Sequence, residues 1–135
     1  MLDRFQTSSP LDDLMAVTTP EELGECQRAC AEVYCDPALK ECCVRLVQRT
    51  RQHPDVALGA SPRGSLGLLH SAQARAAAQG REFVLPDDLK GLAAGVLTHR
   101  VMLTPNAELR GVTPLSIIDE ILAAEAVPTA ARRLA

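Results

Sequence analysis

Apolar residues recur every three or four positions along five stretches of the chain, which is the spacing of helices with one apolar face. Each stretch begins at a proline, which suits the first position of a helix because it presets the backbone and lacks an N–H. The pattern predicts helices over residues 20–34, 37–52, 62–79, 86–98 and 114–124. The sequence therefore predicts an all-α fold, a small helical bundle with at most one short extended arm.

The predicted inward faces of these helices are built from aliphatic residues and cysteine. They are Leu23, Cys26, Cys30 and Val33; Leu39, Cys42, Cys43, Leu46, Val47 and Thr50; Leu66, Leu69, Ala72, Gln73 and Ala76; Leu89, Leu92, Ala93, Val96 and Leu97; and Ile117, Ile118, Ile121 and Leu122. Between the helices, we expect residues 82–86 and 99–103 to be extended and residues 104–111 to form a loop.

The composition is that of one compact domain. The chain has 135 residues, of which 47% are hydrophobic, but it has only two Phe, one Tyr and no Trp, so the core must be aliphatic. We expect a helical domain over residues 20–126, a partly ordered N-terminal segment over residues 1–19 and a frayed tail over residues 127–135.

Charge and hydropathy exclude two classes of partner. The net charge of −3 argues against nucleic-acid binding, because domains that bind nucleic acid normally carry a basic face. No apolar run reaches the roughly 18 residues needed to cross a bilayer, and no N-terminal signal pattern is present. We therefore expect a cytoplasmic protein with neither a nucleic-acid nor a membrane partner.

The five cysteines, Cys26, Cys30, Cys35, Cys42 and Cys43, lie close together in the sequence. Their number is odd and no C-x-x-C pair occurs, so neither a zinc site nor a disulfide framework fits. Free cysteine is usually a small buried hydrophobe. We expect most of Cys26, Cys30, Cys42 and Cys43 to be buried and free of metal.

No pattern in the chain forms a catalytic centre. There is no phosphate-binding loop of the form G-x-x-x-x-G-K-[ST], no G-x-S-x-G elbow and no H-E-x-x-H. The three histidines are spread over different predicted elements. The chain is therefore not expected to be an enzyme on its own.

One arginine stands in an unusual place. The stretch "DVALGASPRGSL", residues 55–66, puts Arg63 in the first turn of a predicted helix, where the helix dipole disfavours a cation. Two explanations are open: Arg63 pairs with Asp55 or another carboxylate of this chain, or it is aimed at an anion that arrives from outside.

Residues 51–103, "RQHPDVALGASPRGSLGLLHSAQARAAAQGREFVLPDDLKGLAAGVLTHRVML", resemble the C-terminal helical lid of the MoxR family of AAA+ ATPases, and the preceding helices from about Pro20 look similar too. The resemblance implies that the arginine of G-A-S-P-R, here Arg63, is the sensor-2 residue. In the family this residue reaches from the lid to the phosphates of ATP bound in a separate α/β domain. Gly59, Ala60, Ser61 and Pro62 would shape the turn that presents it.

The physical chemistry of the same stretch agrees with this assignment. Pro62 starts the helix at little cost, and the small Gly59 and Ala60 leave room for another domain to lie close. A helix N-terminus attracts anions, and the guanidinium group is a fork of donors that suits phosphate. Ser61, Pro62 and Arg63 are therefore the candidate cofactor-binding residues.

The resemblance also implies a larger machine. In the family, ATP and Mg²⁺ lie between the core domain and the lid, neighbouring subunits form a hexameric ring, and hydrolysis remodels or matures partner proteins, often ones with a von Willebrand factor A domain. This chain lacks the phosphate loop, the acidic Mg²⁺ site and the water-polarising residue. Alone, it is expected neither to hydrolyse ATP nor to hold it tightly.

The N-terminal "LDRF", residues 2–5, resembles a motif at the end of the family's nucleotide-binding domain. There an arginine, here Arg4, can act as an arginine finger on the ATP of a neighbouring subunit. In this chain the motif is followed at once by "QTSSPLDDL", whereas the family has a connecting stretch of about two dozen residues that includes the first lid helix. We therefore expect a truncated fragment, in which Arg4 has no finger role of its own.

The alternative is a free-standing helical interaction module with no nucleotide role. The two hypotheses differ in the surface that they predict around Arg63. A lid separated from its core exposes the apolar patch that normally faces the core, whereas an independent module should be polar there.

Overall fold

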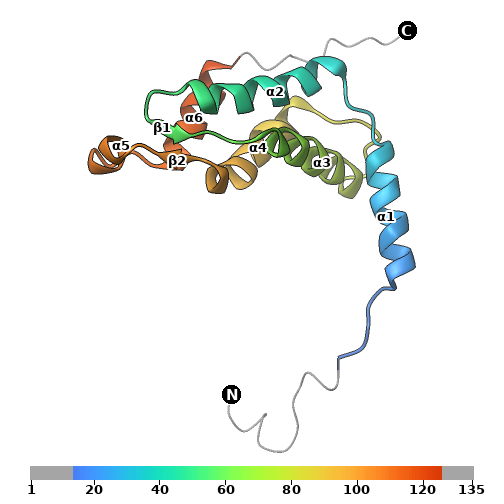
Figure 1. Cartoon of the computed structure of the whole chain (residues 1–135). Coiled ribbons are helices and arrows are strands. Elements are labelled where there is room, and N and C mark those ends of the chain that lie inside the picture. The colour runs from blue at the N-terminus through green and yellow to red at the C-terminus, as the bar shows by residue number, and fades with distance from the viewer. Residues whose placement is uncertain (1–13, 126–135) are drawn as a thin grey trace, which may run out of the picture.

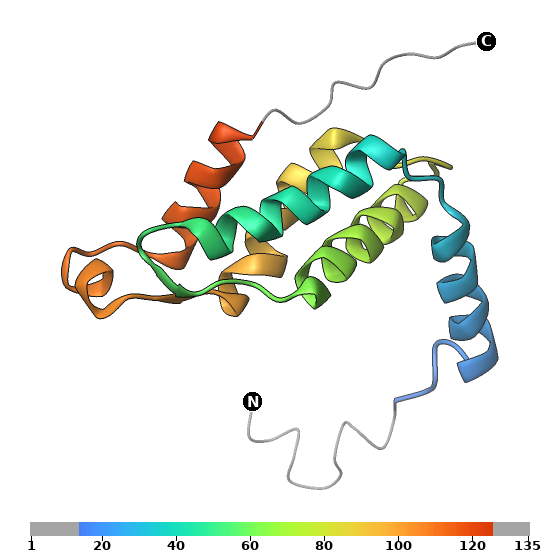
Figure 2. The same ribbon diagram turned by 45° about the horizontal axis from the view of Figure 1, so that its top comes forward.

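The computed structural model describes residues 14–125, and within them the predicted all-α fold is confirmed. Helices α2, α3, α4 and α6 form the body, and α1 extends from one end of it (Figures 1 and 2). The helices are α1 (Pro20–Glu32), α2 (Pro37–Gln52), α3 (Pro62–Ala78), α4 (Pro86–Leu97), α5 (Pro105–Leu109) and α6 (Pro114–Ala124), and a short 3₁₀ helix, η2 (Thr98–Arg100), follows α4.

The helix starts follow directly from local chemistry. Every predicted start is correct, because each proline occupies the first helical position. Thr19 and Glu22 form a capping box at α1, and Asp36 caps α2 by accepting a hydrogen bond of 2.8 Å from the N–H of Ala38. The ends are also close to prediction: α1 ends at Glu32, two residues before the predicted end.

The core lies between α2, α3, α4 and α6, and its fully buried large side chains are Leu46, Leu68, Leu89, Leu97, Ile117 and Ile118. Helices α3 and α4 run antiparallel. A Cβ added to Gly64, near the start of α3, would lie 3.2 Å from Leu97 at the end of α4, and one added to Gly91 would meet Arg75 near the end of α3. The first turn of α3 is therefore close to the last turn of α4.

Two short strands pair with each other beside the helical body. β1 (Val56–Leu58) pairs antiparallel with β2 (Met102–Leu103), with Val56 opposite Leu103 and an irregular register towards Leu58 and Met102. The extended arm expected over residues 99–103 is thus correct only in part, because His99 and Arg100 belong to η2 and only Met102–Leu103 pair with the apolar run that precedes Gly59. This pairing ties the connection between α2 and α3 to the segment after η2.

The loop expected over residues 104–111 is wrong in part, because this segment contains α5. Thr104 accepts a hydrogen bond of 3.2 Å from the N–H of Ala107, Pro105 occupies the first helical position, and Ala107 is fully buried. These start signals are the same as those of the longer helices. A helix of only five residues shows no repeat of apolar positions, so periodicity misses it.

The inward face predicted for residues 20–34 is also wrong, except at Val33, which is buried directly after the end of α1. No residue of α1 is buried: Leu23 is 52% exposed, Cys26 is exposed and Cys30 is only half-buried. The helix extends away from the body (Figure 1) and is tied to it at its end, where the side-chain amide of Gln73 donates to the backbone oxygens of Ala31 and Val33. Periodicity shows which face of a helix is apolar, but not what covers that face.

The cysteine prediction is therefore only half correct. Cys42 and Cys43 are buried in α2, as expected, whereas Cys26 and Cys30 lie on the uncovered helix. Burial raises the pKa of the Cys43 thiol to about 12, so the thiol is protonated at neutral pH. Cys42 and Cys43 thus behave as small hydrophobic core residues.

Candidate functional site

The turn from Gly59 to Arg63 connects β1 to α3 and presents the arginine that the sequence singles out. Ser61 is the extended N-cap residue, Pro62 takes the first helical position and Arg63 follows it in the first turn. Arg63 is exposed, and none of the ion pairs within residues 14–125 involves it. Its guanidinium donors therefore face solvent.

The first explanation for Arg63, pairing with Asp55, is wrong. The carboxylate of Asp55 accepts a hydrogen bond from Arg110, which follows α5. The backbone N–H of Asp55 donates to Nδ1 of His53, 3.2 Å away. Asp55 thus ties the start of β1 to the α5 region, and the positive charge of Arg63 is not neutralised by it.

The turn is fastened to the last turn of α2 through Ala60, which is fully buried. The N–H of Ala60 donates to Oγ1 of Thr50 at 3.0 Å, and the carbonyl oxygen of Ala60 accepts from Nε of Arg51 at 2.8 Å. The hydroxyl of Thr50 in turn donates to the backbone oxygen of Val47 at 2.6 Å. Both backbone polar groups of Ala60 are thus paired with the side chains of α2.

These contacts could not be predicted from the sequence. Thr50 fits the apolar stripe of α2, and Arg51 belongs to a basic helix end that suits the dipole, so local reasoning accounts for both without a tertiary role.

The prediction for Gly59 needs a related correction. A Cβ at Gly59 would lie 2.7 Å from the backbone of Arg51, so its small size admits α2 of the same chain rather than another domain.

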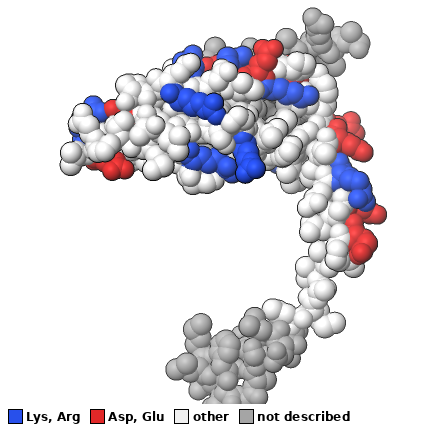
Figure 3. Space-filling model, in the orientation of Figure 1, with Lys and Arg blue, Asp and Glu red and all other residues white. Residues whose placement is uncertain are grey.

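The start of α3 retains free polar groups. The side chain of Ser61 makes no capping hydrogen bond, and the N–H of Gly64 is paired with the oxygen of Ser61 at 2.7 Å. An uncapped helix N-terminus beside an exposed guanidinium fits a phosphate group, which offers several acceptor oxygens and negative charge. The face of the body seen in Figure 3 carries more Lys and Arg than Asp and Glu, which also favours an anion.

The same donor set does not suit a metal ion. Within residues 14–125, no group of three or more His, Cys, Asp and Glu side chains could hold one. Within this part of the chain, the donors at the start of α3 suit an anion and no residue cluster suits Mg²⁺.

Three large apolar side chains lie exposed near this turn. Leu58, just before Gly59, is 61% exposed, and its partner on β2, Met102, is 62% exposed. Leu66 is 55% exposed and, three residues after Arg63, lies on the same face of α3. The sequence placed Leu66 in the core, which is wrong, because Gly64 and Leu68 face the core in this part of α3. Further along the helix, Ala72, Gln73 and Ala76 are buried as predicted.

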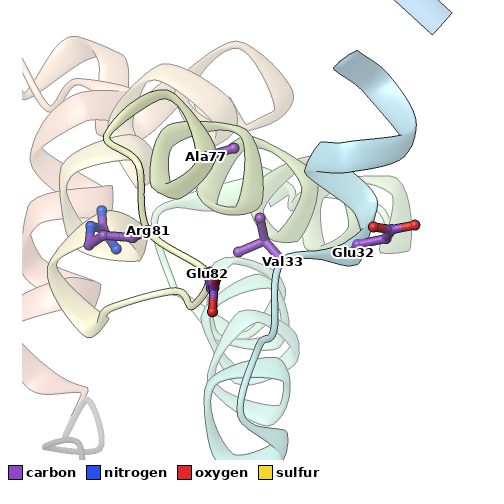
Figure 4. A pocket seen from close by; sticks show the side chains of 5 residues that line it. All are labelled: Glu32, Val33, Ala77, Arg81 and Glu82. Atoms are coloured by element: carbon purple, nitrogen blue, oxygen red, sulfur yellow. The ribbon is translucent and has the colours of Figure 1, made fainter. Parts of the chain in front are cut away.

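A hollow lies at the end of α3 opposite Arg63 and is lined by Glu32, Val33, Ala77, Arg81 and Glu82 (Figure 4). In Figure 4 the Arg81 side chain points away from Glu32, and its guanidinium donates to Asp88. The only cation at this hollow is thus engaged within the fold, unlike Arg63.

Comparison with known proteins decides between the hypotheses. The profile of a family described as the AAA lid domain matches residues 48–121, a span that starts in α2, contains the turn at Arg63 and ends in α6. The chain belongs to this AAA lid family. The prediction of a lid is therefore confirmed.

Relatives place the lid in the MoxR type, as the sequence predicted. It is 43% identical over 128 residues to YeaC of Bacillus subtilis, covering 95% of this chain and 40% of that protein. It is 33% identical over 131 residues to Chaperone MoxR1 of Mycobacterium tuberculosis, covering 84% of this chain and 35% of that protein. The chain thus spans less than half the length of these relatives.

A solved structure shows the same fold. The crystal structure of a candidate ATPase from Cytophaga hutchinsonii superimposes on the lid with a TM-score of 0.71 at 28% sequence identity. The match covers 76% of this chain and 34% of that one.

Other predictions concern parts of the chain that these observations do not reach. Arg4 and the rest of "LDRF" lie outside the described residues, as do residues 1–13 of the predicted N-terminal segment and the predicted tail. Within the described residues, no helix is long and apolar enough to cross a membrane.

Proposed function

We propose that the lid contributes Arg63 as a sensor-2 arginine to ATP held by a separate core domain. The observation that carries this proposal is an exposed guanidinium in the first turn of α3, with no carboxylate of residues 14–125 paired to it. No described carboxylate neutralises the positive charge of this guanidinium, and its N–H donors face solvent. A phosphate that docks against the turn would use both.

The lid would contribute to hydrolysis by stabilising negative charge on the phosphate oxygens. ATP supplies the phosphoryl group that is transferred to water, and charge accumulates on its oxygens during transfer. Arg63 would hold those oxygens with charge-assisted hydrogen bonds, and the N-terminus of α3 would add its dipole. The phosphate loop, the Mg²⁺ site and the attacking water belong to the core domain, because this chain has no motif for them.

The surface around Arg63 favours a lid over a free-standing interaction module. Leu58, Leu66 and Met102 are each more than half exposed and lie on the elements that flank the turn. A core domain that closes on the nucleotide would cover them, removing apolar area from water. An independent module without a core domain is expected to be polar on this surface.

We extend the proposal to the whole protein in the terms of its relatives. A MoxR-type ATPase would place this lid and a core domain on either side of ATP and Mg²⁺, with neighbouring subunits completing a hexameric ring. The work done by hydrolysis would be chaperone-like, as the name Chaperone MoxR1 describes for that relative. Proteins with a von Willebrand factor A domain are the partners proposed.

A lid exchange tests the role of Arg63. Residues 20–125 replace the matching segment of YeaC, and steady-state ATP turnover is measured for this chimera and for its Arg63→Ala variant. Turnover should fall steeply, with about 10³-fold as an upper guide from arginines that contact a transferring phosphoryl group. The matched control is Lys90→Ala, which removes an exposed positive charge from α4 near the far end of α3 and should leave turnover unchanged. Equal turnover in the chimera and in Arg63→Ala would refute the sensor role, as would a chimera that binds no ATP.

A further inference from the structure

Two residues at the end of α2 have no role in the function proposed above, yet they hold the turn on which it depends. We propose that Thr50 and Arg51 are positioning residues for Arg63, fixing the turn so that its guanidinium meets the phosphates at a set place. This inference rests on the proposed sensor role of Arg63.

The first evidence is the complete pairing of Ala60. Its N–H reaches Thr50 Oγ1 at 3.0 Å and its carbonyl oxygen receives Arg51 Nε at 2.8 Å, so one residue of the turn is fixed from both sides. Thr50 is itself fully buried and directed by its donation to Val47. Because the hydroxyl gives its own proton to Val47, its lone pairs are left for Ala60.

The second evidence is steric and independent of these hydrogen bonds. Gly59 lies against the Arg51 backbone so closely that even a methyl group would be at 2.7 Å. On the other side, a Cβ on Gly64 would be 3.3 Å from both Ala60 and Val47. The turn is therefore wedged between α2 and the start of α3, and only Ser61, Pro62 and Arg63 project to solvent.

Such fixation matters for a phosphate contact more than for folding. A catalytic group displaced by about 1 Å can lose on the order of 10²-fold in rate, so its support must be rigid. Arg63 lies only three residues beyond Ala60, which leaves little slack between the anchor and the guanidinium. Without the hydrogen bonds of Thr50 and Arg51 to Ala60, the turn between β1 and α3 could change its position.

Thr50→Val tests the inference in the same YeaC chimera. Valine keeps the shape of threonine but cannot accept the Ala60 hydrogen bond, and Thr50→Ser is the matched control that retains the hydroxyl. We expect Thr50→Val to lower kcat by about tenfold to 10²-fold, and Thr50→Ser to keep most of it, with both proteins folded by circular dichroism.

The decisive measurement repeats Thr50→Val in the Arg63→Ala background. A residue that acts through Arg63 has nothing left to position there, so the double variant should turn over ATP at the rate of Arg63→Ala alone. A further loss in the double variant, or full activity of Thr50→Val, would overturn the inference while leaving the sensor role intact. Unchanged turnover in Arg63→Ala, by contrast, would refute the sensor role itself.

Arg51→Ala provides a second route should Thr50→Val fail to fold, because Arg51 is exposed whereas Thr50 is fully buried. Arg51→Ala should lower turnover in the chimera, and it should cause no further loss when Arg63 is already replaced by alanine. A loss that persists there would mean that Arg51 touches the nucleotide directly or supports the fold, and its positioning role would be wrong.

Discussion

The guanidinium of Arg81 donates two hydrogen bonds to the carboxylate of Asp88, at 2.9 and 2.8 Å, across the connection between α3 and α4. The same carboxylate accepts the N–H of Leu85 at 2.8 Å and so caps α4. Burial favours the neutral acid, but the hydrogen bonds from Arg81 and Leu85 outweigh it, and the pKa of Asp88 is lowered. The pair is placed to hold the two antiparallel helices in register.

Removing this charge should destabilise the lid. Asp88→Asn loses the charge-assisted bonds and should lower the free energy of unfolding by about 2 kcal/mol at pH 7, measured by urea titration. Asp87→Asn is the matched control in the same helical turn, where the side chain is exposed, and it should change stability by less than about 0.5 kcal/mol. Equal effects of the two substitutions would contradict the structural role of Asp88.

Acid should remove the same contribution from the wild-type lid. The folded pKa of Asp88 lies below its ordinary value of 3.8, so the stabilisation is present above pH 3.8 and is lost as pH falls through the folded pKa. Glu125 behaves alike, because hydrogen bonds from Arg45 and Arg49 lower its pKa from 4.5. Urea midpoints between pH 7 and pH 2 should fall below about pH 4, and less steeply in Asp88→Asn. Parallel curves for the two proteins would contradict this.

Arg63→Ala should leave the stability of the lid almost unchanged, since its side chain makes no ion pair with the residues that the structure describes. We expect a change within about 0.5 kcal/mol in urea unfolding. Leu68→Ala on the same helix is the contrast, because its fully buried side chain should cost about 2–5 kcal/mol. A loss of several degrees in Tm for Arg63→Ala would show that the arginine is structural.

Two glycine substitutions should act in opposite directions. Gly59→Ala puts a methyl group 2.7 Å from the Arg51 backbone and should destabilise the lid by about 1–3 kcal/mol. Gly95→Ala, inside α4 with nothing within 4 Å of the new Cβ, should stabilise it by about 0.5–1 kcal/mol. Thermal unfolding of both variants measures the contrast, and a stabilising Gly59→Ala would disprove the close approach.

The cysteines should divide into two classes of reactivity. Cys26 is exposed and should be alkylated by iodoacetamide in the folded lid, whereas Cys42 and Cys43 should react only after unfolding. Burial raises the pKa of Cys43 to about 12, so its thiolate is scarce as well as shielded. Mass mapping of alkylated peptides with and without urea distinguishes the classes. Alkylation of Cys43 as fast as that of Cys26 would contradict the packing of α2.

Local signals in the sequence predict much of this fold, and tertiary contacts account for what they miss. Pro37 and Pro114 mark helix starts because a first turn depends only on neighbouring residues. The exposure of Leu23 could not be predicted, because an apolar stripe does not show whether another element packs against it. Arg63 was found through its motif and its odd place against the dipole. Thr50 was not, because a threonine in an apolar stripe looks the same whether or not it binds a distant backbone.

Helix α2 connects the proposed nucleotide contact to the opposite end of the lid. It is 16 residues long, so it spans about 24 Å. At one end it holds the turn of Arg63, and at the other, Asp36 and Pro37 connect it to α1. A swing of about 10° about one end moves the opposite end by about 4 Å, more than the length of a hydrogen bond. In the proposed function, a change in the angle of α2 on gain or loss of a phosphate at Arg63 would therefore displace α1 at the other end of the helix.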